Sequence, residues 1–235
     1  MDEFEEFDDF DKSDSEEKEE ISNKQRRRKE LRKDILQWVN AILIALLVAY
    51  LLKAFVFERA QVDGHSMDNT LQDKQTLIEY KLGVLFSAPS RGDIVVVELN
   101  SGNYSKYLPI IDNDPNNPEV DLIKRVIGLP GETVDIKGGF VYVTNEKGTA
   151  KLIEPYVQGT TEKTTSALNI KYPYKVPNDS IFVMGDNRNI SEDSRFFGAF
   201  KISAVRGVAV FRISPFKDFG ALDKSGKVSL EYQPK

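Results

Sequence analysis

Three short segments of this 235-residue chain contain most of the side chains that could carry out chemistry. Residues 62–71 (VDGHSMDNTL) place Ser66 in a polar turn, and residues 121–132 (DLIKRVIGLPGE) place Lys124 among strong β-formers. Residues 184–195 (MGDNRNISEDSR) form a dense polar run. With no cysteine and one histidine, the chain can have no disulfide, cysteine nucleophile or multi-histidine metal site. Hydrolysis would therefore depend on serine, threonine, carboxylates or lysine.

Lys124 could serve as a base if its side chain faces the protein interior. Desolvation penalises an ammonium ion and lowers its pKa, and a neutral amine can accept the proton of a serine hydroxyl. Because strand residues alternate, we expect one of Lys124 and Arg125 to face inward and the other outward. Each segment also has a plainer interpretation: a surface serine in a β-turn, an outward-facing lysine, and a solvated loop. The loop charges could form a structural network of ion pairs among Asp186, Arg188, Asp193 and Arg195.

The elements that would position these side chains are mostly β-strands. Six β-rich runs lie between turn signals: 76–80, 93–99, 121–128, 140–144, 180–186 and 205–213. No long amphipathic helix is visible after residue 58, so the pattern predicts a mostly β domain with antiparallel sheets. We expect a long loop over 100–120 and a smaller inserted β region over 132–178, with weaker strands.

An apolar segment precedes the β-rich region. As a helix, residues 35–57 would rise roughly 34 Å, enough to cross a hydrocarbon core of about 30 Å. A buried core helix rarely stays apolar on all faces, and no small-residue cleavage pattern of a signal peptide follows the run. Residues 24–33 carry seven basic residues, and positive charge stays cytoplasmic. We therefore expect a cytoplasmic tail over 1–34, a transmembrane anchor over 35–57 and an extracytoplasmic domain over 58–235.

The tail begins with an acidic, low-complexity run. Residues 2–20 contain twelve acidic residues and two lysines, and phenylalanines recur every third residue at Phe4, Phe7 and Phe10. This pattern is compatible with an amphipathic helix that binds a partner. A disordered, self-repelling tail is the favoured interpretation.

Taken in order, the three polar segments resemble the boxes of the type I signal peptidases, the Ser–Lys serine proteases that remove signal peptides. The run 91–96 (RGDIVV) matches a further box, and the anchor just before the first box fits as well. The resemblance covers most of residues 35–215. The single anchor and the compact insertion look more like the Gram-positive branch of the family.

The resemblance implies a role for each matching residue. Ser66 would be the nucleophile and Lys124, neutral, the general base. Ser191 matches the serine that orients the lysine amine. The buried pair of the family matches Asp193 and Arg195, while Asp186 and Arg188 would brace the same loop. By motif position, the shallow apolar substrate pockets would be lined by Val62, Met67, Leu71 and Ile123.

Three departures from the family pattern concern the surroundings of the site. A serine hydroxyl that some members offer to the oxyanion is absent, because Gly64 stands two places before the nucleophile. The family usually has proline where this chain has Asn69, and the run 189–190 (NI) replaces the commoner Asp-Asn. His65, next to Ser66, suggests a Ser–His pair, but adjacent residues of an extended chain point to opposite sides. We therefore expect His65 to be a bystander.

The resemblance also implies substrates and partners. The substrates would be preproteins cut after an Ala-x-Ala-like site and bound as an added β-strand, with no metal, no other cofactor and no nucleic acid. The partners would be these preproteins and the lipid bilayer, with the translocation machinery as a further candidate. One alternative is a non-catalytic, membrane-anchored β-domain that binds exported proteins. Another, a self-cleaving repressor-type Ser–Lys protease, is disfavoured by the anchor and by the lack of a DNA-binding segment.

Overall fold

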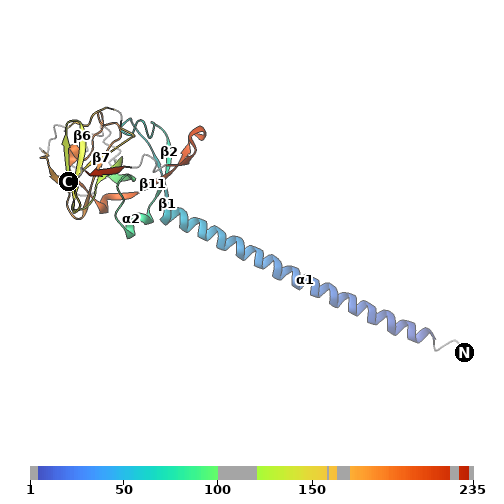
Figure 1. Ribbon diagram of the computed structural model, residues 1–235. Helices are drawn as coiled ribbons and strands as arrows, with labels where there is room; N and C mark the ends of the chain where they lie inside the picture. Colours follow the sequence, from blue (N-terminus) through green and yellow to red (C-terminus); the bar gives the residue numbers. More distant parts are fainter. Residues whose placement is uncertain (1–4, 100–120, 158, 163–169, 223–227, 233–235) are drawn as a thin grey trace. The chain divides into compact units, whose positions relative to one another are not determined.

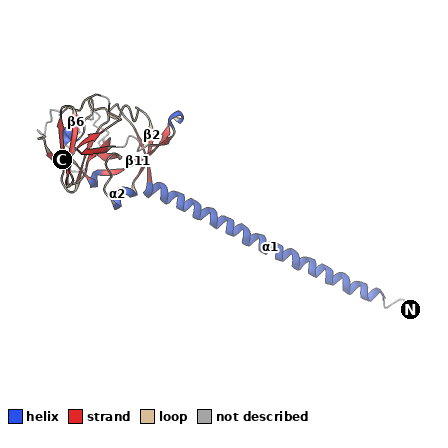
Figure 2. Cartoon of the chain, in the orientation of Figure 1, coloured by secondary structure: helices blue, strands red, loops and turns tan. Residues whose placement is uncertain are grey.

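The computed structural model describes residues 5–99, 121–157, 159–162, 170–222 and 228–232, and gives the backbone alone for residues 5–25. The chain divides into two compact units, Met1–Leu52 and Lys53–Lys235. The first unit is helical, and the second consists almost entirely of strands and loops (Figure 2).

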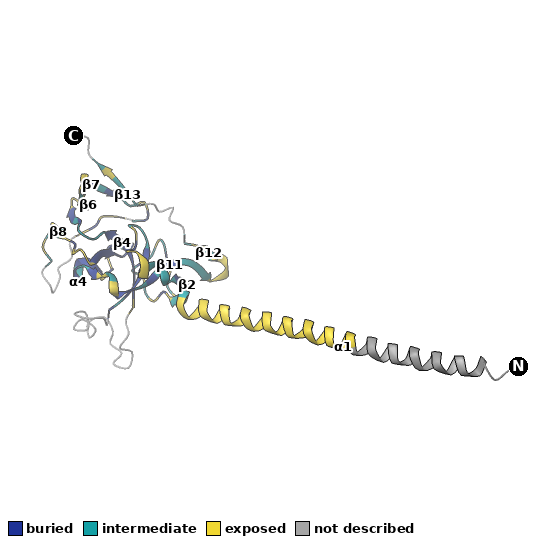
Figure 3. Ribbon diagram, turned by 90° about the horizontal axis from the view of Figure 1, so that it is seen from below, coloured by how far each residue is buried: buried dark blue, intermediate teal, exposed yellow. Residues whose placement is uncertain are grey.

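The helical unit is formed by α1 (Glu5–Leu51), and a π-helical turn, η1 (Leu52–Val56), follows it. No proline or glycine interrupts residues 5–51, so nothing in the covalent chain stops the helix. The interpretation of the acidic tail as disordered is therefore wrong for residues 5–20, which are helical. Arg26–Val56 is long and apolar enough to cross a membrane. Its most apolar stretch is exposed, not packed as a core helix would be (Figure 3).

The β unit contains two antiparallel sheets (Figure 1). The first has the order β1-β2-β11-β3-β4-β9-β10, with β12 paired to β11. Its strands are β1 (Phe57–Gln61), β2 (Thr76–Tyr80), β3 (Ile94–Glu98), β4 (Asp121–Gly128), β9 (Ser180–Met184), β10 (Phe200–Lys201), β11 (Val205–Ser214) and β12 (Gly220–Ala221). The second has the order β13-β7-β6-β5-β8. Its strands are β5 (Thr133–Lys137), β6 (Phe140–Asn145), β7 (Gly148–Ile153), β8 (Tyr174–Lys175) and β13 (Ser229–Tyr232). The short helices are α2 (Leu82–Phe86), α4 (Ser194–Phe197), η3 (Ile202–Ala204) and η4 (Phe216–Asp218).

The predicted mostly β, antiparallel architecture is confirmed, and a strand lies at each of the six predicted runs. The weaker strands expected within 132–178 are β5 to β8, which form most of the second sheet. This sheet also takes in β13, near the end of the chain, which the sequence pattern did not reveal. The loop predicted over 100–120 lies outside the described residues.

Both faces of the first sheet are packed around β4. One face carries a core cluster that includes Val95, Leu122 and Val126, and the other carries a cluster that includes Ile94 and Ile123. Alternate residues of β4 therefore enter two different cores, and every residue of the strand after Asp121 is buried. A charged residue after Asp121 in this strand has no solvent-facing side to occupy.

Candidate active site

Ser66 and Lys124 are in direct contact, although 58 positions separate them in sequence. Lys124 lies on β4, and its Nζ is 2.8 Å from Ser66 Oγ and 3.2 Å from the carbonyl oxygen of Ile123. Ser66, in the turn that follows β1, is half-buried, whereas Lys124 is only 3% exposed. The pair thus joins a reachable hydroxyl to an amine that is shielded from solvent, at a distance suited to proton transfer.

Burial lowers the pKa of Lys124 to about 8, because the ammonium ion loses its hydration in the interior. The negative charges of Asp193, Glu192 and Asp186 oppose this effect, and the positive charge of Arg195 adds to it. Within the described part of the chain, Lys124 makes no ion pair with a carboxylate. Desolvation therefore outweighs the surrounding charges, and the neutral amine is accessible near physiological pH.

The turn over residues 65–71, called the nucleophile turn from here on, is held by the third polar segment. Asn187 donates its backbone N–H to the carbonyl of Ser66 at 3.0 Å and its side-chain amide to the carbonyl of His65 at 3.2 Å. Ser66 N donates a hydrogen bond to none of the described residues. The backbone on both sides of the serine is thus fixed, while its own N–H stays available to an incoming oxyanion.

His65 is directed away from a role as base. Its Nδ1 lies 3.2 Å from Asp68 Oδ2 within the same turn, and its side chain is 63% exposed. Among the described residues, it makes no hydrogen bond with Ser66 Oγ. An exposed imidazole paired with a neighbouring carboxylate is a surface feature of the turn.

The expectation that one of Lys124 and Arg125 faces solvent is wrong, because the two are 3% and 2% exposed. They alternate as strand residues do, but both faces of β4 are covered. Arg125 makes two hydrogen bonds to Asp186, Nε to Oδ1 at 2.9 Å and Nη2 to Oδ2 at 2.6 Å. Its Nη1 donates to the carbonyl of Gly92 at 2.9 Å. The partner of Asp186 is thus the residue next to Lys124.

Arg188, expected to brace the same loop as Asp186, pairs instead with Glu154. Two hydrogen bonds join them, one of 3.0 Å from Nη1 to Oε2 and a shorter one from Nη2 to Oε1. Arg188 also donates to Thr161 Oγ1 at 2.7 Å and to the carbonyl of Gly185 at 3.0 Å. Because Glu154 and Thr161 follow β7, this arginine connects the third polar segment to residues that extend from the second sheet.

Asp193 and Arg195 form a fully buried, two-pronged ion pair, with both Nε–Oδ1 and Nη2–Oδ2 at 2.9 Å. Asp193 also caps α4 by accepting from Arg195 N at 3.0 Å, and it accepts from Gly185 N at 3.0 Å. Burial alone would raise the pKa of Asp193, but the charge and hydrogen bonds of Arg195 hold that pKa below its usual range.

Gly185 leaves room for the serines on either side of it. A Cβ atom at this position would lie 2.5 Å from the carbonyl oxygen of Ser66, and nearer still to Ser191 Oγ. The buried Ser191 hydroxyl helps to lower the pKa of Asp193, yet it makes no hydrogen bond of full geometry with a described residue, Lys124 included. Any side chain at position 185 would displace the nucleophile turn or this hydroxyl.

The four residues assigned to substrate pockets lie together. Val62, Met67, Leu71 and Ile123 belong to one core cluster, at 3%, 1%, 0% and 9% exposure. The first three offer almost no surface in this conformation, whereas Ile123 is at the margin of the cluster. Three of these residues come from the segment that contains Ser66, and Ile123 comes from the strand that carries Lys124.

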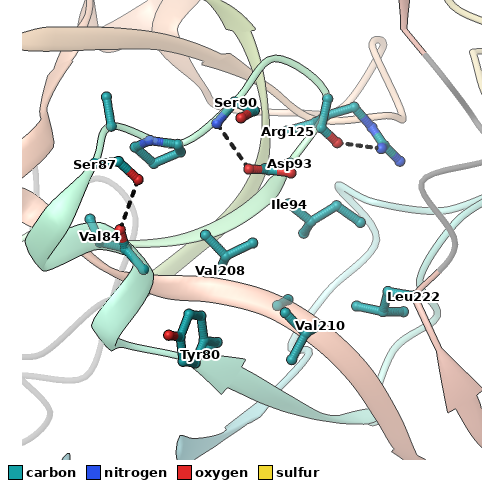
Figure 4. Close-up of a pocket in the computed structure, with 15 residues that line it drawn as sticks. Tyr80, Val84, Ser87, Ser90, Asp93, Ile94, Arg125, Val208, Val210 and Leu222 are labelled. Atoms are coloured by element: carbon teal, nitrogen blue, oxygen red, sulfur yellow. Dashed lines mark hydrogen bonds between the residues drawn. The ribbon is translucent and has the colours of Figure 1, made fainter. Parts of the chain in front are cut away.

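A separate cavity of about 270 Å³ is lined by α2, residues 87–94 and β11 (Figure 4). Its walls include Tyr80, Val208 and Val210, and Arg125 lies at its border. Neither Ser66 nor Lys124 lines it. The cavity is therefore distinct from the site of the serine and lysine.

Several residues of this arrangement were not singled out from the sequence: Thr70, Arg125, Glu154, Tyr156, Thr161, Gly185 and Asn187. Arg125, Gly185 and Asn187 lie within the recognised segments, so their positions in the motifs could have indicated them. Glu154 and Thr161 come from the inserted region, and no local pattern marks them. Across the described residues, there is no group of three side chains suited to hold a metal ion.

Comparisons with known proteins identify the family of this chain. The family model described as "Signal peptidase, peptidase S26" matches residues 35–214. A signal peptidase I from Bacillus licheniformis is 37% identical over 82% of this chain and 95% of its own length. One from Leptolyngbya laminosa is 34% identical over 80% and 84%, respectively. The crystal structure of a signal peptidase I from Enterococcus faecalis is 29% identical, covers 52% of this chain and 97% of that one, and has a TM-score of 0.34.

The length and identity of these matches define the class of the protein as a serine endopeptidase that acts on signal peptides. The chain belongs to the signal peptidase family, peptidase S26, and within it to the type I enzymes.

Proposed function

We propose that this signal peptidase cuts exported preproteins after an Ala-x-Ala-like site, with Ser66 as the nucleophile and neutral Lys124 as the general base. The observation that carries the proposal is the 2.8 Å separation of Lys124 Nζ and Ser66 Oγ in a desolvated setting. The exposed His65, turned toward Asp68, offers no competing base.

The proposed mechanism follows from this geometry. Lys124 accepts the hydroxyl proton as Ser66 Oγ attacks the scissile carbonyl, and Ser66 N–H stabilises the oxyanion. The resulting ammonium then protonates the leaving amine, and the acyl–enzyme ester is hydrolysed by a water that Lys124 deprotonates. Asp193, Arg195, Asp186 and Arg188 act by holding the surrounding segments. Ser191, whose hydroxyl makes no hydrogen bond with Lys124 in this conformation, would orient the amine by forming that bond during the reaction.

The substrate would bind as an extended strand. Among the described residues, β1 is the terminal strand of its sheet, and residues 121–124 of β4 pair with β3 alone, whereas later residues of β4 also pair with β9. These two edges lead to Ser66 and Lys124, so a strand added there would carry its peptide bond to the pair. Its small side chains would enter shallow pockets lined by Val62, Met67, Leu71 and Ile123, which would have to separate slightly.

We further propose that residues 35–57 anchor the enzyme in the membrane. The basic residues of the tail over 1–34 would keep that tail in the cytoplasm, and residues 58–235, with the inserted region 132–178, would lie outside. The anchor would raise the local concentration of the enzyme at the bilayer that holds its substrates. The lipid bilayer and the translocation machinery are the partners of this arrangement.

Cleavage of a preprotein in detergent micelles by the wild type, Ser66→Ala and Lys124→Ala tests the mechanism. Release of the mature protein by the wild type alone, with both variants folded, is the expected result. Activity in Lys124→Ala would overturn the lysine as base. A wild type that binds but cuts no preprotein would favour the non-catalytic alternative.

The absence of cysteine makes the topology directly testable. Single cysteines introduced at Ser13 and at Lys147 can be labelled in intact cells with a membrane-impermeant maleimide. Labelling at position 147 but not at 13 is expected, and the reverse pattern would contradict the orientation.

A further inference from the structure

A short segment from the second sheet reaches all three polar segments of the active site. This segment, residues 154–157 and 159–161, is called the strap from here on. It directly follows β7, and Thr161 N donates to the carbonyl of Gly139, between β5 and β6, at 2.8 Å. Both ends of the strap are therefore fixed to the second sheet, which holds none of the proposed catalytic residues.

Tyr156 is the centre of these contacts. Its ring lies 4.0 Å from the guanidinium carbon of Arg125, and its hydroxyl donates to Glu154 Oε1 at 2.8 Å. Its carbonyl accepts a long hydrogen bond of 3.5 Å from Asn69 Nδ2. At 9% exposure, Tyr156 is buried, so its contact with the buried Arg125 is shielded from water, whereas Asn69 is exposed and its hydrogen bond is only partly buried.

The strap continues the network on both sides of Tyr156. Glu154 and Thr161 bind the buried guanidinium of Arg188, which in turn donates to the carbonyl of Gly185. Gly185 packs against the carbonyl of Ser66, where no Cβ would fit. The strap thus acts on the nucleophile turn both directly, through Asn69, and through the third polar segment.

The nucleophile turn needs such support at Asn69. This residue has φ = 84°, in the left-handed region that asparagine tolerates and that proline, with φ near −65°, cannot adopt. The turn therefore lacks the covalent restraint of the proline usual in the family. The next residue, Thr70, donates to Asp186 at 2.5 Å, and Asp186 is held by Arg125 beneath the Tyr156 ring.

We propose that the strap positions the nucleophile turn, and that Tyr156 keeps Ser66 within reach of Lys124 by holding Asn69 and Arg125 in place. The inference rests on the proposed function for its catalytic consequence. A displacement of about 1 Å between reacting groups can cost on the order of 100-fold in rate, so a residue that touches neither group can control turnover. Tyr156 is a positioning residue in this scheme.

The test compares Tyr156→Leu, Tyr156→Phe and Asn69→Gly with a matched control, in the full-length protein in detergent micelles. Tyr156→Leu removes ring and hydroxyl, Tyr156→Phe removes the hydroxyl alone, and Asn69→Gly keeps a positive φ but loses the amide. The control is Tyr232→Phe, which removes a hydroxyl bonded to Asn145 in the same sheet, away from the turn.

Hydrogen exchange of residues 62–75 gives a readout that does not depend on activity. Exchange is expected to accelerate at least about tenfold in Tyr156→Leu and less in Tyr156→Phe and Asn69→Gly, with Tyr232→Phe like the wild type. In cleavage assays, Tyr156→Leu should lower kcat by on the order of 10–100-fold with KM little changed. The midpoint of the rise in activity with pH should be the same in Tyr156→Leu and in the wild type. General loosening of the fold would instead hydrate Lys124, raise its pKa and shift that midpoint to higher pH.

Unchanged exchange over 62–75 and unchanged kcat in the folded Tyr156→Phe and Asn69→Gly variants would overturn the inference, even if Tyr156→Leu fails to fold. A uniform loss of protection across both sheets, with a displaced pH profile, would also overturn it by assigning the strap a general structural role. If the wild type cuts no preprotein but exchange changes as expected, the proposed function fails and the positioning role stands.

Discussion

Lys124 and Arg125 are neighbours on one strand and are equally buried, but they differ in the partners that surround their charged groups. Arg125 has a carboxylate, a carbonyl and an aromatic face around its guanidinium, so its charge is fully compensated. Among the described residues, Lys124 has the Ser66 hydroxyl and one carbonyl as its partners. Burial without a counterion lowers an amine's pKa, whereas burial with one preserves the charge. The same strand thus carries an amine of lowered pKa on one face and a structural cation on the other.

Arg188 and Arg195 extend the comparison. Each buried arginine near the site has its own carboxylate partner, Glu154 and Asp193 respectively. These pairs keep the carboxylates occupied, so none of them forms an ion pair with Lys124. The pairing of the arginines with these carboxylates therefore leaves desolvation as the dominant influence on the pKa of Lys124. Substitutions in the arginine pairs and substitutions of Lys124 thus test the same account.

The largest effect on cleavage is expected from Lys124→Arg, which places a guanidinium at position 124, as Arg125 does at the next position. A guanidinium stays protonated at any accessible pH and cannot accept the Ser66 proton. Preprotein cleavage should fall by on the order of 10²–10⁴-fold, the usual contribution of a general base. Retained activity in Lys124→Arg would contradict the difference drawn between the two residues.

Lys124→Met should also lose cleavage but gain stability, because it removes the cost of burying an amine. The folded-state pKa of Lys124 is about 8, below the roughly 10.4 of an unfolded chain. The unfolded state therefore binds more protons between these values, and wild-type stability rises with pH across that window. The gain in melting temperature should be largest below pH 8 and disappear above about pH 10.4. A melting temperature lowered at pH 7 would count against an unpaired lysine.

The next largest effect is expected from Asp193→Asn, which breaks the paired arrangement. The variant would leave the charge of Arg195 buried without a counterion, at a cost of about 3–5 kcal/mol. Thermal unfolding should show this loss. Cleavage by the folded fraction should fall, because one of the two oxygens, which accept from Gly185 N and from Arg195 N, is replaced by an NH2 group that cannot accept. Glu192→Gln, one residue away and exposed, is the control and should change stability little. Equal losses of stability in the two variants would mean that the Asp193–Arg195 ion pair does not stabilise the fold more than an exposed carboxylate does.

The sequence allows β4 to be predicted, because a run of strong β-formers over residues 121–128 is a local signal. The roles of Ser66 and Lys124 were proposed from the resemblance of their segments to family motifs, and the fold brings these two side chains into contact. The partners of the arginines could not be predicted in this way. Arg188 and Glu154 are 34 positions apart, and Tyr156 and Asn69 are 87 apart, so only the fold brings them together. Alternation alone also gave the wrong exposure for Arg125, because it does not reveal whether the second face of a sheet is covered.

A smaller effect is expected in the pH dependence of the wild type. Activity should rise about tenfold per pH unit below the pKa of Lys124 and level off above about pH 8, since the neutral amine is the active form. Arg195→Lys keeps a positive charge near Lys124. In the folded variant, activity should therefore rise with pH over a range similar to that of the wild type. A limb near 10.4, the ordinary value for lysine, would show that Lys124 is hydrated in the working enzyme.

The smallest effect is expected at Glu79, a buried acid that extends the comparison to the opposite charge. Glu79 is 0% exposed, its carboxylate oxygens accept no hydrogen bond from a described residue, and Arg206 is 3.7 Å away. Burial raises its pKa, so the folded state holds the proton more tightly and wild-type stability falls as pH rises above about 4.3. Glu79→Gln should therefore melt like the wild type in acid and a few degrees higher at pH 7 to 8.

Glu58→Gln is the matched opposite, because Glu58 is paired with Lys81 at 2.9 Å and with Arg206 at 2.7 Å. Its hydrogen bond with Lys81, against a partly opposing burial, lowers the pKa of Glu58, so its contribution to stability is present at neutral pH and lost in acid. Glu58→Gln should melt slightly lower than the wild type at neutral pH and approach it in acid. If both glutamine variants changed the melting temperature in the same direction, close pairing would not decide whether these two glutamates stabilise the fold.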